Sequence, residues 1–342
     1  MSELLKVESL AKHYEIGKSV VRAVDGVSFT IGARESLGLV GESGCGKSTV
    51  GRSILRLIEP SAGQVVFDGE DVLGKSPREM RDLRRDMQII FQDPFSALNP
   101  RLTVAQAIEE PIIIHGRSSR AERRAKVDEA LRLVGLRPEH RDRFPHEFSG
   151  GQRQRIGIAR ALVLDPRFVV ADEAVSALDV SVQAQILNLL HDLQERLGLS
   201  MLFISHDLGV IRYVCQRVAV MYLGRIVEIG TVEDVIREPL HPYSRLLLSA
   251  VPKLDPRQRS RRSTVAGELP SPLDPPGGCP FHTRCPHRMP VCDQIAPSMS
   301  GAAPDRSVAC HLFGGSPAVS PAVSLKGKSD EPAGHHNQGE PQ

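Results

Sequence analysis

A glycine-rich segment at residues 41–49, GESGCGKST, has the residue types that bind the phosphates of a nucleoside triphosphate. In such a loop, consecutive backbone N–H groups surround phosphate oxygens, and glycine lets the main chain approach them closely. The spacing predicts that Lys47 neutralises phosphate charge and that Ser48 coordinates Mg²⁺. A strand-like apolar run precedes the loop and helical spacing follows it, as the motif requires. The residues expected to contact the nucleotide are Gly41, Ser43, Gly44, Cys45, Gly46, Lys47, Ser48 and Thr49.

A second segment at residues 168–173, FVVADE, is an apolar strand that ends in two carboxylates. Phosphoryl transfer needs one carboxylate near Mg²⁺ and another group that orients the attacking water. We expect Asp172 to take the first role and Glu173 to act as the general base. A strand ending in Asp-Glu is common on its own, so this interpretation depends on the phosphate loop upstream.

Two further motifs indicate which family of nucleotide-binding proteins the sequence resembles. Residues 148–152 read FSGGQ before a helical segment, and residues 176–179 read SALD just after the carboxylate pair. With Gln92 in IIFQDP and His206 in ISHD, these motifs resemble the ATP-binding-cassette (ABC) ATPases in order and spacing. The resemblance covers roughly residues 5 to 250.

The resemblance implies a head-to-tail dimer of two cassettes that enclose two ATP molecules. The SGGQ segment would complete the site of the opposite subunit, because the N–H groups and dipole at a helix start suit a γ-phosphate. Gln92 would join Ser48 and Asp172 around Mg²⁺, and His206 would contact the γ-phosphate. Tyr14 resembles the aromatic residue that stacks on adenine, with a surface or core aromatic as the alternative. The resemblance thus adds to the nucleotide site Tyr14, Ser149, Gly150, Gly151, Gln152 and Asp179.

Strands that alternate with helices indicate a parallel α/β sheet. The resemblance implies a P-loop NTPase fold of the ABC-cassette type, with a RecA-like core, an antiparallel β subdomain and a helical subdomain. We expect the cassette at residues 1–252, with its helical subdomain at about 95–165, and a closing hairpin at 217–229. A C-terminal region at 253–313 and a disordered tail at 314–342 follow.

Four cysteines lie in the C-terminal region with the spacing C-x₅-C-x₆-C-x₁₇-C. In a reducing compartment such a cluster favours metal binding over disulfides, and four thiolates suit a [4Fe–4S] cluster or zinc. Close C-x₂₋₄-C pairs, which zinc sites usually show, are absent. The segment GELPSPLDPPGGCPFHTRCPHRMPVC resembles the C-terminal region of oligopeptide and dipeptide importer ATPases, which also favours the cluster; zinc and no metal are the alternatives. The expected ligands are Cys279, Cys285, Cys292 and Cys310.

Composition limits the partners. With 43 basic and 41 acidic residues the net charge is only +2, so nothing favours a nucleic-acid partner. No run of 18 apolar residues occurs and the N-terminus lacks the apolar stretch of a secretory signal. We therefore expect a cytoplasmic protein that reaches the membrane through other subunits.

The importer resemblance implies which subunits these are. They are a second, D-type ATPase that pairs with this F-type chain, two transmembrane permeases and an extracytoplasmic substrate-binding protein, at the cytoplasmic side of the inner membrane. Peptides are the expected cargo, with nickel chelates and oligosaccharides as alternatives. A soluble cassette ATPase of DNA repair or translation is disfavoured because no long heptad stretch is present. A regulatory module with a degenerate nucleotide site is disfavoured because Lys47, Glu173 and His206 are all present.

Overall fold

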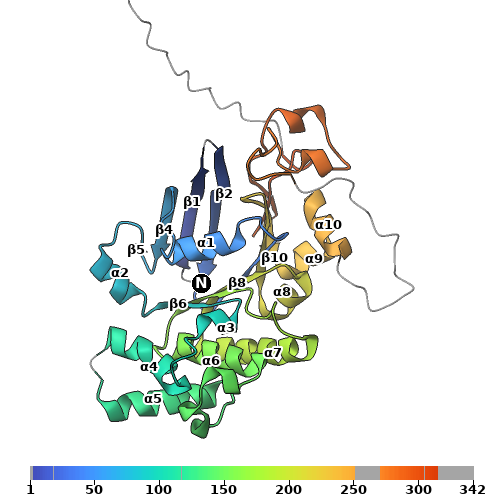
Figure 1. Cartoon of the computed structure of the whole chain (residues 1–342). Coiled ribbons are helices and arrows are strands. Elements are labelled where there is room, and N and C mark those ends of the chain that lie inside the picture. Colours follow the sequence, from blue (N-terminus) through green and yellow to red (C-terminus); the bar gives the residue numbers. More distant parts are fainter. Residues whose placement is uncertain (1–2, 18, 117, 251–269, 304, 315–342) are drawn as a thin grey trace, which may run out of the picture.

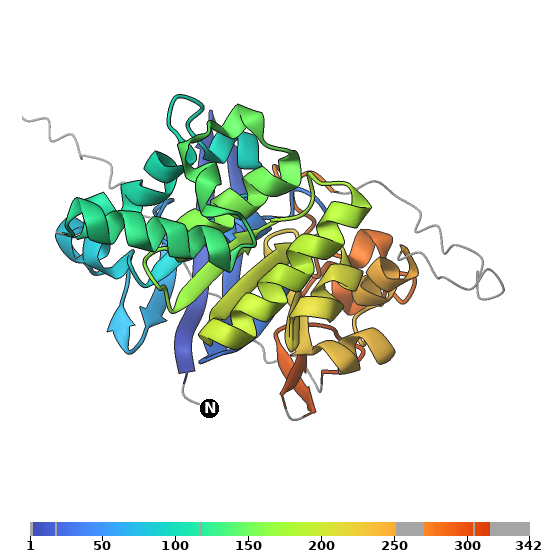
Figure 2. The same cartoon turned by 90° about the horizontal axis from the view of Figure 1, so that it is seen from below.

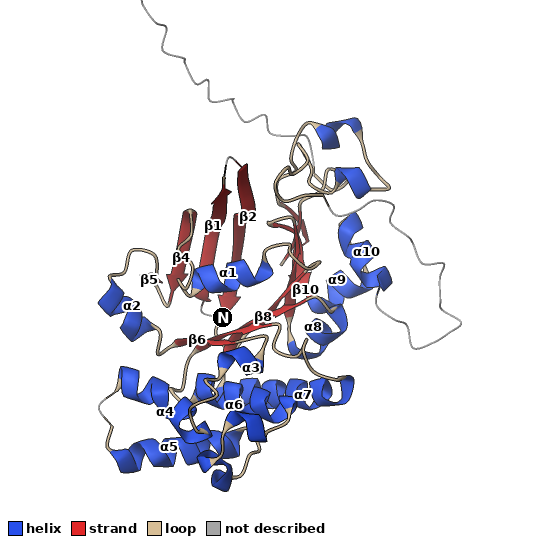
Figure 3. Cartoon of the chain, viewed as in Figure 1, coloured by secondary structure: helices blue, strands red, loops and turns tan. Residues whose placement is uncertain are grey.

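The computed structural model describes residues 3–17, 19–116, 118–250, 270–303 and 305–314. In Figure 1 and Figure 3 most strands lie in the upper half of the view, and several helices gather in the lower half. The fold is α/β, as the sequence predicts.

An eight-stranded sheet forms the centre, in the order β11-β12-β10-β9-β3-β8-β7-β6. Neighbours from β9 to β6 are parallel, whereas β10, β12 and β11 form an antiparallel edge. Every residue of β3, β7 and β8 is buried, as expected for parallel strands covered on both faces. The strands are β3 (Ser36–Val40), β6 (Met87–Ile90), β7 (Phe168–Asp172), β8 (Ser200–Ser205), β9 (Arg217–Tyr222), β10 (Arg225–Thr231), β11 (Ser300–Ala303) and β12 (Arg306–Val308).

A four-stranded antiparallel sheet lies beside the centre. It has the order β2-β1-β4-β5 and comprises β1 (Glu3–Ile16), β2 (Ser19–Gly32), β4 (Ala62–Phe67) and β5 (Glu70–Asp71). Helix α1 (Lys47–Ile54) packs between the two sheets, where Val50 joins an apolar core with Leu5 of β1 and Ile204 of β8. The start of α1, which carries the end of the glycine-rich loop, is therefore anchored from both sheets.

Helices α3 to α7 gather in a layer below the central sheet in Figure 1, on the side away from the antiparallel sheet. A capping box starts α4 and another starts α5, so sequence signals define both N-termini. A second apolar core joins this layer to the central sheet. The helices are α2 (Pro77–Leu83), α3 (Pro94–Ala97), α4 (Val104–His115), α5 (Arg120–Leu133), α6 (Gly150–Leu162), α7 (Val180–Leu197), α8 (Leu208–Val214), α9 (Val232–Arg237) and α10 (Pro242–Ala250), with short 3₁₀ turns at Pro138–Asp142, Pro145–Glu147, His282–Arg284 and Pro290–Asp293.

The C-terminal segment adds two strands to the central sheet, which the sequence did not predict. Strand β12 pairs with β10 through Val308 opposite Glu228. Glu228 is fully buried and accepts hydrogen bonds from the N–H groups of Leu240 and His241, at 3.0 Å each. The guanidinium of Arg306 on β12 lies 2.9 Å from the same carboxylate. A buried ion pair thus attaches the segment to the cassette.

Several expectations have a structural outcome. Helices α4, α5 and α6 lie within the stretch at about 95–165 where the helical subdomain is expected, and the hairpin at 217–229 is confirmed as β9 and β10. Apart from residue 314, the tail expected to be disordered lies outside the described residues, as do residues 253–269 of the expected C-terminal region. Within the described ranges, no helix is both long and apolar enough to cross a bilayer.

Replacing Arg306 with methionine should lower the free energy of unfolding by about 3 kcal/mol, because the Glu228 carboxylate would stay buried without its cation. Urea unfolding of the full chain measures this change. Arg167→Met is the matched control, since its ion pair with Asp68 is half exposed and should contribute less than about 1 kcal/mol. Equal losses in the two variants would contradict the anchoring role of Arg306.

Candidate functional site

The glycine-rich loop connects β3 to α1, and two of its glycines are sterically required. Gly46 precedes α1 with a φ of 103°, and a Cβ there would lie 1.9 Å from the Ala23 carbonyl oxygen. A Cβ on Gly41 would lie 2.2 Å from the carbonyl oxygen of Met221. The loop therefore passes so close to β2 and β9 that only glycine fits at both positions.

Lys47 places a buried cation at the centre of the loop. Its side chain is 4% exposed, and its Nζ donates hydrogen bonds to the carbonyl oxygens of Gly41 at 2.9 Å and Glu42 at 3.0 Å. The Glu173 carboxylate lies 4.0 Å from the same Nζ. An ammonium group is stable in such a place only when oxygen atoms surround it, and phosphate oxygens would satisfy the same requirement.

Ser48 and Asp172 bring two hard oxygen ligands together. The Ser48 hydroxyl donates to Oδ1 of Asp172 at 2.6 Å, although the two residues are 124 positions apart. Asp172 ends β7 fully buried, and a guanidinium nitrogen of Arg52 lies 3.4 Å from its other oxygen. Mg²⁺ prefers a hydroxyl and a carboxylate beside phosphate oxygens, so this pair fits the metal that the loop motif implies.

Glu173 has a left-handed backbone conformation with a φ of 47°, which is uncommon outside glycine. The conformation is held from both sides: its N–H donates to the carbonyl of Ile204, and its own carbonyl accepts from Ser176. The carboxylate accepts a hydrogen bond from Nε2 of Gln92 at 2.9 Å and lies 3.8 Å from Nδ1 of His206. Such outliers concentrate at functional sites.

These groups meet because they follow neighbouring parallel strands. The loop follows β3, His206 follows β8 and Gln92 follows β6, while Asp172 ends β7 and Glu173 comes directly after it. Ligands of open α/β sheets bind at the carboxyl ends of the strands. The expected catalytic and Mg²⁺ residues are thus brought together as two hydrogen-bonded pairs, Ser48 with Asp172 and Gln92 with Glu173, with Lys47 and His206 within 4.0 Å of the Glu173 carboxylate.

The SGGQ segment lies elsewhere. Ser149 caps α6 with a capping box that includes Gln152, and no hydrogen bond or ion pair among the described residues joins the segment to the loop. A Cβ on Gly151 would lie 2.4 Å from Cγ1 of Val182 on α7, which explains a glycine there. Ser149 is exposed, so its hydroxyl and the start of α6 face away from this chain's own core.

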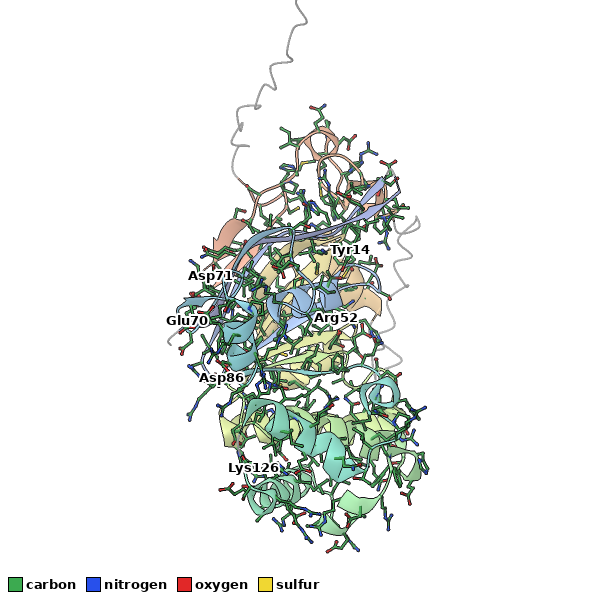
Figure 4. The ribbon with its side chains drawn as sticks, turned by 60° about the vertical axis from the view of Figure 1, so that its left-hand side comes forward. Tyr14, Arg52, Glu70, Asp71, Asp86 and Lys126 are labelled. Carbon is green, nitrogen blue, oxygen red and sulfur yellow. The ribbon has the colours of Figure 1, made fainter. Side chains whose placement is uncertain are left out.

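Within the described part of the chain, Asp179 and Tyr14 also form no hydrogen bond or ion pair with the residues around Glu173. Asp179 caps α7, and hydrogen bonds from the Ser181 hydroxyl and the Val182 N–H lower its pKa. Tyr14 is partly exposed on β1 opposite Val21, with the Lys12 ammonium 5.0 Å from its ring centre. Figure 4 shows Tyr14 in the same part of the molecule as Arg52 on α1, whereas Lys126 on α5 lies at the other end.

A hollow opens between the central sheet and the helical layer, and it is lined in part by Phe91, the residue before Gln92. Its wall includes Leu57, Phe91 and Ile114, which are 47%, 37% and 45% exposed. Large apolar side chains gathered around a concave surface are typical of contact with a partner.

Sequence reasoning missed one residue of the loop and its partners. The Glu42 carboxylate forms two hydrogen bonds with the guanidinium of Arg284, at 2.9 and 3.0 Å, and its N–H donates to Oη of Tyr243 at 2.8 Å. These partners lie more than 200 positions away, so no local spacing signals them.

The four C-terminal cysteines lie close together as free thiols. Burial raises the pKa of Cys279 to about 11, and the charges of the other three thiolates act in the same direction. However, no group of three or more His, Cys, Asp or Glu side chains in the described part of the chain is placed to hold a metal ion. The metal site expected from Cys279, Cys285, Cys292 and Cys310 is therefore not supported by the arrangement of these side chains.

Comparisons with known proteins agree with the geometry. Residues 24–176 match the family described as ABC transporter, and residues 227–292 match the oligopeptide/dipeptide transporter C-terminal region. A putative peptide import ATP-binding protein of Brucella ovis is 56% identical over 307 residues, covering 90% of this chain and 97% of that protein. The oligopeptide transport ATP-binding protein AppF of Bacillus subtilis is 49% identical over 320 residues, covering 91% of this chain and 97% of AppF.

Solved cassettes have the same fold. The ATP-binding cassette MJ0796, a dimer bound to ADP and Pi, is 31% identical with a TM-score of 0.62, covering 67% of this chain and 99% of that one. CbiO1 of Clostridium perfringens is 30% identical with a TM-score of 0.62, covering 70% and 92%. The chain belongs to the ABC transporter family, as an ATPase subunit with an oligopeptide/dipeptide transporter C-terminal region.

Proposed function

We propose that this chain hydrolyses ATP to drive the import of peptides through partner permeases. The observation that carries the proposal is the single group formed by Lys47, Glu173, Gln92 and His206 beside the Ser48–Asp172 pair. The peptide cargo follows from the names of relatives such as the Brucella and Bacillus proteins; nickel chelates and oligosaccharides are the alternative cargoes.

The loop would bind ATP through its backbone N–H groups, and Lys47 would exchange the carbonyl oxygens of Gly41 and Glu42 for phosphate oxygens. Ser48, Asp172 and Gln92 would hold Mg²⁺. When bound, Mg²⁺ neutralises charge on the β- and γ-phosphates. Tyr14 would stack on the adenine ring.

Glu173 would act as general base. A water oxygen attacks the γ-phosphorus, its proton passes to the Glu173 carboxylate, and the bond from the γ-phosphorus to the bridging oxygen breaks, releasing ADP and phosphate. Gln92, which already donates to Glu173, would orient the water, and His206 would contact the γ-phosphate.

Glu173→Gln should keep ATP binding and reduce hydrolysis by at least about a hundredfold, because the amide keeps the shape but cannot accept the proton. ATPase assays and peptide uptake by the assembled transporter measure the loss, and size-exclusion chromatography with ATP should show a trapped cassette dimer. Glu59→Gln, an exposed carboxylate after α1, is the matched control. Undiminished turnover in Glu173→Gln would contradict the assigned role.

Each ATP site would be completed by the SGGQ segment of the opposite cassette, here a D-type partner. In the partner's site, the γ-phosphate would be bound by this chain's Ser149, Gly150, Gly151 and Gln152, with Asp179 at the same interface. Two observations support this arrangement: Ser149 is exposed at a helix start, and no bond among the described residues connects it to its own loop.

Ser149→Arg should inactivate the ATP site of the partner subunit, because a long side chain would occupy the position of the γ-phosphate. The experiment uses a heterodimer in which this chain's own site carries Glu173→Gln, so that the remaining turnover reports the partner site alone. Loss of that turnover is expected; persistence would show that the SGGQ segment does not act in trans.

The permeases would bind at the apolar hollow that contains Leu57, Phe91 and Ile114, next to Gln92, so that the state of the nucleotide site reaches them. An extracytoplasmic binding protein would deliver the peptide. This assembly places the chain at the cytoplasmic face of the inner membrane. The uptake assay on the assembled transporter tests the assembly together with the function.

We further propose that Cys279, Cys285, Cys292 and Cys310 bind a [4Fe–4S] cluster, with zinc as the alternative. The proximity of the four thiols supports this proposal, since each of Cys279, Cys285 and Cys310 has a pKa influenced by other members of the set. Within the described residues these side chains form no ready ligand set, so loading would require them to rearrange.

Anaerobically purified full-length protein should contain iron and absorb broadly in the blue part of the visible spectrum. Cys292→Ser should lose the iron, whereas Cys215→Ala, which removes a buried cysteine after α8, should retain it. Zinc in place of iron would exclude the cluster, and protein free of both metals would exclude the site.

A further inference from the structure

The C-terminal segment contacts the phosphate loop directly. Arg284, in the 3₁₀ turn just before Cys285, forms the two hydrogen bonds with Glu42 described above. The Arg284 side chain is only 9% exposed, and that of Glu42 is 30% exposed. A paired, largely buried guanidinium of this kind is geometrically specific, unlike the mobile ion pairs of an open surface.

Aromatic packing holds this turn in place. The ring of Phe281 lies 5.3 Å from that of Tyr222 at the end of β9 and 5.5 Å from that of Tyr243 on α10. Tyr243 also accepts the N–H of Glu42 through its hydroxyl oxygen. The main chain and the side chain of Glu42 are therefore both bound by residues from beyond the loop. Figure 1 and Figure 2 both show the C-terminal segment close to α10.

Glu42 poses an electrostatic problem for the loop. A loop that binds a polyphosphate gains from positive charge, yet this one carries a carboxylate between Gly41 and Ser43. Without a counter-charge, that carboxylate would repel the phosphates. Arg284 supplies the counter-charge and fixes the Glu42 carboxylate in one position. The backbone carbonyl of Glu42 accepts a hydrogen bond from Lys47.

We propose that Arg284 is a positioning residue of the nucleotide site: it neutralises Glu42 and thereby makes the affinity of the loop for ATP depend on the docked C-terminal segment. The proposal rests on the ATP-binding role of the loop. It assigns the C-terminal segment a part in nucleotide binding, whether or not its cysteines hold a metal.

The test is a charge-balance experiment on the full chain, with ATP affinity measured by equilibrium dialysis in the cold without Mg²⁺. Arg284→Gln should bind ATP about fivefold more weakly, equivalent to about 1 kcal/mol, because the Glu42 charge is left uncompensated. Glu42→Gln should bind ATP as well as or better than the parent. The double variant should return to within about twofold of the parent, because both charges are gone.

Two controls separate this effect from damage to the fold. Arg288→Gln breaks an ion pair with Asp293 in the same segment without touching the loop and should leave ATP affinity unchanged. Arg284→Lys keeps the charge and should stay within about twofold of the parent, even if Arg284→Gln proves unstable. The loss in Arg284→Gln should also be larger for ATP than for ADP, since ATP carries more phosphate charge.

Some outcomes would overturn the inference. A double variant as weak as Arg284→Gln would mean that Arg284 supports the fold rather than the charge balance. Unchanged ATP affinity in Arg284→Gln would also overturn the inference, and so would a loss in Arg284→Lys as large as that in Arg284→Gln. A parent chain that does not bind ATP at all would instead contradict the ATPase function, which distinguishes failure of the function from failure of the inference.

Discussion

A buried ammonium group determines how the rest of the site is built. Lys47 is almost fully enclosed, and an unpaired charge in that position would be strongly destabilising. The carbonyl oxygens of Gly41 and Glu42 and the Glu173 carboxylate meet its requirement. Glycine at positions 41 and 46 lets the loop close around it against β2 and β9. The parallel strands then bring the carboxylates and Gln92 to the same edge of the sheet.

The C-terminal region belongs physically to the cassette. Arg306 completes the surroundings of a fully buried carboxylate at β10, and Arg284 completes those of Glu42 in the phosphate loop. Both arginines come from a segment whose two strands, β11 and β12, extend the central sheet. Removal of the segment would therefore expose one buried charge and unbalance another, so the cassette cannot be treated as independent of it.

The site was predictable wherever chemistry is encoded in local spacing. Residues 41–49 and the strand ending at Asp172 predicted a loop and two carboxylates that the structure places close together. The family resemblance added Gln92 and His206, and both follow strands that neighbour β7. What could not be predicted depends on contacts between distant residues. Strand β12, which pairs with β10, has only three residues, too few to show the alternating apolar pattern by which a strand is predicted. The bond between Glu42 and Arg284 spans 242 positions and has no local signature.

The cysteine spacing shows the opposite case. The spacing of four cysteines along the sequence predicts a metal site. Metal binding, however, depends on the distances between the four sulfur atoms, which sequence spacing does not specify. In the described structure the thiols are neighbours without forming a ligand set. Spacing identified residues that lie together, but it did not determine their geometry.

We propose that the Lys47 charge, which the fold buries, binds the phosphates of ATP. Equilibrium binding of labelled ATP to full-length Lys47→Met and to the parent chain tests it most directly. We expect Lys47→Met to bind ATP about tenfold or more weakly than the parent, because a charged hydrogen-bond donor to the phosphates is lost while the apolar stem remains. A folded Lys47→Met chain that binds ATP as tightly as the parent would contradict it.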